Sequence, residues 1–576
     1  MSEQPAERQV TDQDVTTSAV QRQRAATVSA SGLRGGPHGP AADVPDGSPG
    51  TWAPLALSTF RWLWIAQLVS NTGTWMQTVG AQWMLVHQPN AASLTALAQA
   101  ASLLPVLVVS LPAGVLADVL DRRRYLVGVF GAAVVVSGSL AALTQAGLVT
   151  PVVLLMLTFG LGVTNALAGP AWQAIQPELV PPRLIPAAAG LGSMNINIAR
   201  AVGPAVAGAL LLVVSPAVLF AINALSTVAV VVALVAWRRP VNPEREAEPL
   251  VSALRSGSRY VGNAPGVRRV LLRVALFVGP ASALWALLAV VASQRLGLGP
   301  GGYGMLLGAL GAGAVLGALA MARLRGLMSR GVLLAGSSVL FGLGMAGAAL
   351  TSSAVLLVAL LVLAGVGWLV VLSTFSTVLQ LTLPAWVRAR GMAIYLIVMI
   401  GGQGVGAVAW GVVAERLGIG HALLAATALL MLGVVSQAWW PLLARTGAQD
   451  PRVEAIWPEP DVDAGIDLDP RSGPVMVEIR HVVTGDVERF LDAAQRVGVS
   501  RRRTGATSWA VYQDAADAAV FVEVFVVPTW GEHLRQHHER LTGYDRELDV
   551  RMRAFTDQPS VIRHLVPAEW RPTEGA

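Results

Sequence analysis

Residues 354–381 read AVLLVALLVLAGVGWLVVLSTFSTVLQL, an apolar run without a charged residue. As a helix, this run is long enough to cross the hydrocarbon core of a bilayer, which requires about 20 residues. The whole chain has a similar character, since 54% of its 576 residues are hydrophobic and only 13% are charged. Soluble domains usually carry about 25% charged residues. The sequence therefore predicts a polytopic membrane protein.

Eleven further runs of spanning length predict an all-α membrane domain of twelve helices. With the run above, they lie at residues 62–86, 94–117, 125–146, 152–173, 187–212, 216–236, 270–292, 303–322, 332–350, 354–381, 391–413 and 421–443. The longest internal loop, residues 237–269, is expected to be cytoplasmic. It separates an N-terminal six-helix bundle (51–236) from a C-terminal six-helix bundle (270–445).

The loops between the runs differ in positive charge. With the N-terminus inside the cell, the loops on that side hold sixteen arginines, whereas the opposite loops hold only Arg295 and Arg416. Positive charge is retained in the cytoplasm during insertion. We therefore expect a multi-pass protein of the plasma (inner) membrane with both termini cytoplasmic. Because these loops account for much of the basic character, the net charge of +6 does not indicate nucleic-acid binding.

The two ends of the chain lack spanning runs. Residues 1–50 are rich in polar residues, glycine and proline, and predict a disordered cytoplasmic tail. A linker rich in proline and acidic residues (446–472) leads to a soluble segment over 473–567. This segment predicts strands at 475–483, 506–513, 519–527 and 560–566, and helices at 486–498 and 529–555. The β-α-β-β-α-β order predicts a soluble α+β domain of the ferredoxin-like type.

The loop after the second run carries a recognisable motif, Gly114-Val-Leu-Ala-Asp118-Val-Leu-Asp121-Arg122-Arg123-Arg124. It resembles the major facilitator signature G-x-L-A-D-R-x-G-R-R, although Val119 and Asp121 depart from that pattern. The resemblance implies that a conformational latch between the two halves is formed by Gly114, Asp118, Asp121, Arg122 and Arg123. The alternative is an anchor that only sets topology.

The fifth run contains Gly203-Pro204-Ala-Val-Ala-Gly208, which resembles the G-P-x-x-x-G pattern of antiporter-type members. Glycine and proline at this spacing permit close helix packing and a bend, so we expect Gly203, Pro204 and Gly208 to pack against a neighbouring helix. Together with the stretch 170–181, this run resembles the branch that contains enterobactin-type siderophore exporters and transmembrane secretion effectors. The resemblance covers roughly residues 50–445 and continues into the C-terminal domain.

Polar residues form stripes at helical spacing on several of the predicted helices. Lipid-facing amides are disfavoured, so these stripes should point inward, either bonding helix to helix or lining a cavity. The candidates for substrate contact or gating are Gln67, Asn71, Trp75, Thr78, Asn197, Arg200, Gln380, Tyr395, Gln403 and Trp410. A cavity lined by such residues favours an uncharged or weakly charged amphipathic solute.

Arg200 lies about 20 Å into its predicted helix at 1.5 Å per residue. A guanidinium at this depth is costly unless it is paired or hydrated. No carboxylate lies deep in any predicted helix, so amides, backbone, water or substrate must serve as its partner. Both a structural role and a role in substrate contact remain open for Arg200.

Several kinds of chemistry are excluded by composition. The chain has no cysteine and no lysine, which excludes disulfides, thiolate catalysis and lysine nucleophiles, and no Walker A sequence occurs. No convincing catalytic set lies within 473–567, so we expect a protein that is not an enzyme and has no cofactor. His533 and His537 have the i, i+4 spacing of metal ligands on a helix. No separate third ligand is evident, so we expect a solvated helix face and no metal.

The sequence thus predicts a secondary active transporter that exports a small amphipathic molecule, such as a siderophore, antibiotic or drug, by alternating access. Proton coupling, one open alternative for the energy source, usually relies on a membrane-embedded acid. Asp118, Glu178 and Glu415 all lie near the predicted membrane edges, so neither the coupling ion nor the coupling residue is identified. Alternatives are a transporter of lysophospholipid or other lipid, an importer of the same fold, and a membrane-tethered enzyme. The C-terminal segment also resembles monooxygenase-type ferredoxin-like domains, which implies a homodimer through that domain.

Overall fold

The computed structural model describes residues 50–237, 259–441, 457, 460, 462, 468–557 and 560–567. Apart from Gly50, the predicted tail over 1–50 lies outside these residues. Most of the predicted loop over 237–269 and most of the predicted linker over 446–472 also lie outside them. The described residues from Thr51 onward belong to one unit of the chain.

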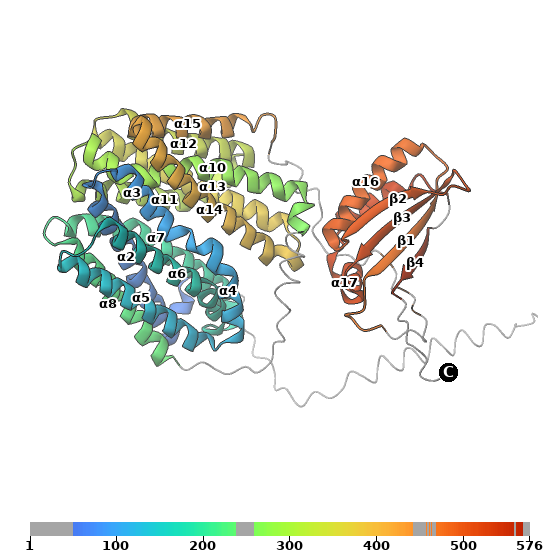
Figure 1. Ribbon diagram of the computed structural model, residues 1–576, viewed down its shortest axis with the longest axis horizontal. Helices are drawn as coiled ribbons and strands as arrows, with labels where there is room; N and C mark the ends of the chain where they lie inside the picture. Colours follow the sequence, from blue (N-terminus) through green and yellow to red (C-terminus); the bar gives the residue numbers. More distant parts are fainter. Residues whose placement is uncertain are drawn as a thin grey trace, which may run out of the picture. The chain divides into compact units, whose positions relative to one another are not determined.

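The membrane part consists of two successive groups of helices, coloured blue to green and green to orange in Figure 1. The first group is α2 (Ser58–Val86), α3 (Ala91–Leu103), α4 (Pro105–Val119), α5 (Arg122–Gln145), α6 (Pro151–Ile175), α7 (Ile185–Leu210) and α8 (Pro216–Ala236). The second group is α10 (Pro265–Val290), α11 (Pro300–Leu327), α12 (Arg330–Leu350), α13 (Ala354–Thr382), α14 (Ala385–Leu417) and α15 (Ile419–Val435). We call these groups the N-terminal and C-terminal halves.

Nine of the described helices are long and apolar enough to cross a membrane, judged by length and composition. Helices α2 and α7 have the length but are more polar, and α15 is shorter, with 17 residues. The described helices therefore establish nine of the twelve expected spans. The chain is a multi-pass membrane protein.

The predicted span at 94–117 is not one continuous helix. It is divided at Leu104 into α3 and α4, and Pro105 is the first residue of α4. Proline has no amide hydrogen, and its ring clashes with the carbonyl one turn earlier, so an α-helix is interrupted at this point. Leu104 nevertheless keeps helical dihedral angles, and Ala91–Ser110 is one of the nine candidate spans, so the prediction of a span in this region is confirmed.

The two halves contact each other through α7 against α11 and through α3 against α14. These contacts lie away from the arginine-rich loops. A Cβ built at Gly208 would lie 2.7 Å from the Cα of Gly304, and one built at Gly411 would lie 2.4 Å from the Cβ of Ala96. The halves therefore meet closely at the end of the bundle opposite the arginine-rich loops.

A buried arginine joins two helices within the C-terminal half. Arg273 of α10 donates to the carbonyl oxygens of Gly433, at 3.3 Å, and Ser436, at 3.1 Å, and also to that of Trp440. The last carbonyl groups of a helix have no partner within the helix, so a cation at this position satisfies them. Arg273 thus fixes the end of α15 against α10.

The C-terminal domain is built around a four-stranded antiparallel sheet with strand order β2-β3-β1-β4. Its elements are β1 (Val475–Val482), α16 (Val487–Thr504), β2 (Ser508–Gln513), β3 (Val520–Val527), α17 (Trp530–Arg535), α18 (Gly543–Arg553) and β4 (Val561–Leu565). In Figure 1, α16 and α17 lie on the same side of the sheet. Alternate residues of β1 and β3 are buried, as expected for strands with one face against helices.

The single helix predicted over 529–555 was wrong. Helix α17 continues as a π-helical turn, η6 (Gln536–Arg540), and a new helix, α18, begins after Thr542. A carboxylate oxygen of Asp545 accepts from the backbone N–H of Thr542 at 2.9 Å, while Arg503 of α16 donates to the other oxygen. These bonds fix a helix start that the local sequence pattern did not indicate.

A charged network lies in the core of this domain. The guanidinium of Arg501 bonds to Glu523 at 2.9 Å and to Asp549 at 3.2 Å. The indole N–H of Trp509 donates to Glu523 at 2.9 Å, and Arg501 stacks on Trp457 with 4.3 Å from Cζ to the ring centroid. All three ionic groups are buried. Trp457, which falls within the predicted linker, thus packs in the core of the domain.

Candidate functional site

An arginine and two tryptophans meet where the halves join. The Cζ of Arg200, on α7, lies 5.7 Å from the ring centroid of Trp75, on α2. Trp75 in turn lies 6.3 Å, centroid to centroid, from Trp285 of α10. We call these three residues the junction. Arg200 and Trp75 belong to the N-terminal half, and Trp285 belongs to the C-terminal half.

Two hydrogen-bond donors of the junction are buried without a partner among the described residues. They are Nε of Arg200 and the indole Nε1 of Trp285. No ion pair to Arg200 occurs in the described part of the chain. Its guanidinium instead makes a cation–π contact with the indole ring of Trp75. Buried donors are nearly always satisfied in native structures, and each exception requires an explanation such as a ligand or water.

A second feature is a chain of amides along α2 and α7. Gln67 donates to Asn71 at 2.9 Å, Asn71 donates to Asn195 at 2.9 Å, and Asn195 donates to the carbonyl oxygen of Trp64 at 2.9 Å. This chain borders a cavity of about 370 Å³ between α2, α6 and α7, whose wall also includes Trp172. The cavity therefore combines amide and aromatic surfaces, as small-molecule sites commonly do.

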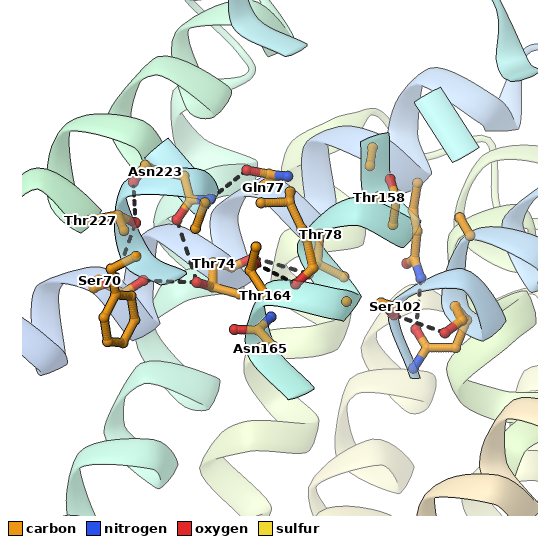
Figure 2. Close-up of a pocket in the computed structure, with 18 residues that line it drawn as sticks. Ser70, Thr74, Gln77, Thr78, Ser102, Thr158, Thr164, Asn165, Asn223 and Thr227 are labelled. Carbon is orange, nitrogen blue, oxygen red and sulfur yellow. Dashed lines mark hydrogen bonds between the residues drawn. The ribbon is translucent and has the colours of Figure 1, made fainter. Parts of the chain in front are cut away.

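A third, smaller pocket lies inside the N-terminal half and is lined mainly by polar side chains (Figure 2). Asn223 donates to Gln77 and, at 3.0 Å, to Ser137, and Ser137 donates to Gln77 at 3.1 Å. Thr78 lines this pocket and donates to a carbonyl of its own helix. With a volume of about 70 Å³, the pocket is well below the ~300–1,000 Å³ of drug-sized sites. We call the hydrogen bonds among Gln77, Ser137 and Asn223 the internal polar network.

The halves are also joined by polar contacts at the end opposite the arginine-rich loops. Tyr303 of α11 is buried and donates to Gln82 of α2. Ser93 of α3 donates to Glu415 of α14 at 3.4 Å. Trp83 stacks on Tyr303 with 6.3 Å between ring centroids. These contacts hold the two halves together at this end.

The candidates of the C-terminal half do not form one group. Gln380 is exposed and donates to Ser376 at 3.0 Å, whereas Tyr395 is buried and donates to the carbonyl of Leu372 at 3.3 Å. Trp410 donates to the carbonyl of Gly279 at 2.9 Å, which joins α14 to α10. Gln403 is half-buried. Asn197 of the N-terminal half donates to the carbonyl of Ser193 at 2.9 Å.

The structure gives the contacts of three of the five residues expected to form the latch. Arg122 pairs with Glu178 at 2.9 Å, and Arg123 donates to the carbonyl of Leu234 at 2.8 Å. These contacts all lie within the N-terminal half. Asp121 accepts from the backbone N–H of Arg124 at 2.8 Å and so caps α5.

The other two latch residues give less information. The side chain of Asp118 lies outside the described residues. A Cβ built at Gly114 would meet no described atom within 4 Å. A latch between the halves remains a prediction.

The small residues of α7 lie against other helices. A Cβ built at Gly203 would lie 2.6 Å from the Cβ of Trp75, and Pro204 is buried. The carbonyl oxygen of Pro204 lies 2.6 Å from the position of a Cβ built at Gly304. With Gly208, these residues allow α7 to approach both α2 and α11 closely.

Replacing Gly208 with alanine is expected to lower the free energy of unfolding by about 1–3 kcal/mol, because the added Cβ would force α7 away from α11. The readout is the midpoint of thermal unfolding in detergent. Gly169→Ala is the control, since a Cβ built at Gly169 meets no described atom within 4 Å. Equal destabilisation in both variants would contradict the packing role of Gly208.

Three histidines of the C-terminal domain gather in one place, contrary to expectation. His533 of α17 and His537 of η6 are buried rather than solvated, and His564 of β4 lies beside them. The expectation of a solvated helix face was wrong, because both side chains are buried and a third histidine lies beside them. Burial, followed by the proximity of His537 and His564, lowers the pKa of His533 to about 3, so its ring is neutral near pH 7.

The sequence did not identify several of these residues. Trp285 and Tyr303 lie in otherwise apolar runs, and only the contact between halves brings them to Trp75 and Gln82. His564 lies on a strand distant in sequence from His533. An aromatic or a histidine within an apolar run was the only local signal available.

The paired halves and the polar junction between them define a membrane transporter with a major facilitator-like fold. The chain belongs to the transmembrane secretion effector family, whose profile matches residues 49–573. The predicted membership of the transmembrane secretion effector family is thereby confirmed.

Similarity to individual proteins is weaker. The staphyloferrin A transporter of Staphylococcus aureus (strain NCTC 8325 / PS 47) is 30% identical over 142 residues, which is 24% of this chain and 36% of that protein. The chain therefore matches only about a third of that relative's length.

Two solved structures have a similar fold. An inward-facing, occupied bacterial homologue of the human lysosomal transporter Spinster is 15% identical, with a TM-score of 0.56 over 68% of this chain and 97% of that one. A D-xylose–proton symporter is 12% identical, with a TM-score of 0.55 over 68% and 99%. At these identities, the likeness shows the fold alone.

Proposed function

We propose that this protein is a secondary active exporter that moves a small amphipathic molecule carrying an anionic group out of the cell by alternating access. In this proposal, α2, α7 and α15 complete twelve spans, and the substrate binds between the halves. The halves contact closely at one end, while the cavity of about 370 Å³ lies on the side of the arginine-rich loops. This asymmetry supports a state open toward the cytoplasm.

The junction is the observation that carries the proposal. Arg200 is a half-buried cation, and neither its buried Nε nor the buried Nε1 of Trp285 has a partner among the described residues. A carboxylate placed between the halves could accept from Nε of Arg200 and neutralise the guanidinium. The surrounding tryptophans and amides suit the remainder of an amphipathic molecule.

The direction of transport and the siderophore class rest on weaker support. The family's description as a secretion effector favours export. The name of the staphyloferrin A transporter makes a siderophore a reasonable first probe for this chain. We therefore choose staphyloferrin A as the anionic probe and ethidium, a cationic amphipathic molecule, as the comparison.

Replacing Arg200 with glutamine is expected to reduce transport of staphyloferrin A by at least about tenfold, because a charge-assisted bond to the substrate is lost. Transport is measured in proteoliposomes, alongside protein yield and thermal unfolding. Arg330→Gln, which removes an exposed arginine at the start of α12, is the control.

The two roles of Arg200 give different results. If its role is only structural, Arg200→Gln should unfold at a lower temperature and insert poorly. Wild-type transport together with wild-type stability would refute the assignment of the junction. Transport of ethidium but not staphyloferrin A by the wild type would refute the anionic substrate class.

A lipid substrate is a second candidate, because an apolar groove opens sideways between α7 and α11. The groove has a volume of about 660 Å³ and is lined by small or apolar residues such as Val202, Val206 and Met305. Translocation of a lysophospholipid in the same proteoliposomes would favour this function. Its absence, together with transport of staphyloferrin A, would favour the first.

We also propose that the C-terminal domain has a ferredoxin-like fold, which the element order and the strand order β2-β3-β1-β4 support. Its expected role is that of a regulatory or dimerising accessory of the transporter. Size-exclusion chromatography with light scattering, on the full-length protein with and without residues 473–567, tests the dimer. Loss of a dimer only in the truncated protein would support this role.

A further inference from the structure

The three histidines of the C-terminal domain come from two separate elements. His533 lies on α17, His537 follows four residues later in η6, and His564 lies on β4. One ligand nitrogen from each lies within 4.8 Å of the others. The ring centroid of His533 is 4.7 Å from that of His537 and 4.9 Å from that of His564. A π-helical turn such as η6 often marks a functional site.

Hydrogen bonding does not account for this arrangement. Both ring nitrogens of His533, and Nε2 of His564, are buried without a well-oriented hydrogen-bond partner among the described residues. A buried polar atom left without a partner costs about 1–3 kcal/mol. Trp530 packs beside His533, with 5.6 Å between ring centroids. This aromatic contact does not offset the cost of the unpartnered nitrogens, because it supplies no hydrogen bond to them. A group that accepts lone pairs would remove it.

The donor set favours one class of ligand. Imidazole nitrogens bind divalent transition metals such as Zn²⁺, whereas Mg²⁺ and Ca²⁺ prefer oxygen ligands. Zinc–nitrogen bonds of about 2.0–2.1 Å in tetrahedral geometry place the nitrogens about 3.4 Å apart. Movements of the ring nitrogens by roughly 1 Å, through rotation of the side chains, would bring them to that spacing. Three protein ligands then leave one position open, as in catalytic zinc sites.

That open position would face a cavity. All three histidines line a space of about 480 Å³, whose other walls include Trp457 and Phe525. The cavity is large enough for a small molecule beside the metal.

We propose that His533, His537 and His564 form a binding site for a divalent transition-metal ion of the zinc class, with one coordination position open to the cavity. All three histidines belong to the C-terminal domain. The site gives that domain a ligand of its own.

The test is direct metal binding by the full-length protein in detergent, purified through a tag without histidine. After removal of metals with EDTA, the protein is dialysed against Zn²⁺, and bound zinc is measured by mass spectrometry. We expect about one ion per chain in the wild type and less than about 0.1 in His533→Ala and in His564→Phe. His538→Ala is the matched control, because His538 is the exposed neighbour of the cluster and should leave binding unchanged.

Hydrogen exchange separates loss of binding from loss of folding. Zinc should slow exchange at residues 530–565 of the wild type, because a ligand that binds only the folded state stabilises it. In the apo form, β1 and β3 of His564→Phe should exchange as in the wild type. Wild-type protein with no zinc bound and no zinc-dependent protection would overturn the proposal. So would loss of binding in His538→Ala as large as that in His533→Ala.

Discussion

Transport should stop when Ala205→Cys and Gly308→Cys are oxidised to a disulfide, and it should return when the disulfide is reduced. The two positions lie on α7 and α11, where the halves meet. A Cβ built at Gly308 is 3.3 Å from the Cβ of Ala205, and disulfides have Cβ separations of about 3.5–4.5 Å. The chain contains no cysteine, so no other disulfide can form within it. A covalent bond here would prevent the halves from separating at this end.

The measurement is transport of staphyloferrin A in proteoliposomes after oxidation and again after treatment with dithiothreitol. We expect at least a tenfold loss on oxidation and recovery on reduction, since alternating access needs both conformations. The single variants Ala205→Cys and Gly308→Cys should respond to neither treatment. Full transport by the cross-linked protein would mean that α7 and α11 need not separate, which would contradict alternating access at this contact.

The C-terminal domain of Glu523→Gln should be less stable than that of the wild type, because the buried guanidinium of Arg501 then keeps only Asp549 as an ionic partner. Breaking a buried ion pair completely costs about 3–5 kcal/mol, which is the upper limit expected here. Burial alone would raise the pKa of Glu523. Attraction to Arg501, with hydrogen bonds from Arg501 and Trp509, outweighs burial and lowers the pKa to about 2. The network therefore favours the ionised carboxylate in the folded state.

This pKa also predicts the pH dependence of stability. A carboxyl group with a lowered folded-state pKa stabilises the fold above its unfolded pKa of 4.5. That contribution should diminish as the pH falls from about 4.5 towards 2, and the dependence should be weaker in Glu523→Gln. Hydrogen exchange of residues 475–565 in the full-length protein provides the measurement.

Glu547→Gln is the matched control, because Glu547 pairs with Arg551 on the exposed face of α18. Exposed pairs contribute about 0–1 kcal/mol, so this variant should exchange almost as the wild type does. Similar effects of Glu523→Gln and Glu547→Gln would show that the buried network does not stabilise the domain.

The features that could be predicted from the sequence are those fixed by local patterns. Long apolar runs gave most of the membrane helices, since a helix satisfies its own backbone groups in lipid. Alternation likewise gave strands close to β1 and β3, predicted at 475–483 and 519–527. The starts and ends of helices were harder, because Pro105 and the Asp545 cap act within otherwise helical patterns.

The candidate site could be predicted only on one side. The polar stripe of α2 and the depth of Arg200 pointed to Trp75 and its neighbours. Trp285 gave no such signal, since a tryptophan in an apolar run is equally compatible with lipid contact. Likewise, His564 becomes a partner of His533 only when β4 pairs with β1. Contacts between segments that are distant in sequence could not be predicted from local patterns.

The internal polar network also bears on the mechanics of the transporter. Its hydrogen bonds join α2, α5 and α8 through Gln77, Ser137 and Asn223. In a hydrocarbon environment, such bonds have no water to replace them, so pulling these helices apart would be costly. The contact between α7 and α11 is instead made largely of glycine and alanine, with few interlocking side chains. We therefore expect α2, α5 and α8 to move together as a rigid group. Relative motion of the two halves should occur mainly at the contact between α7 and α11.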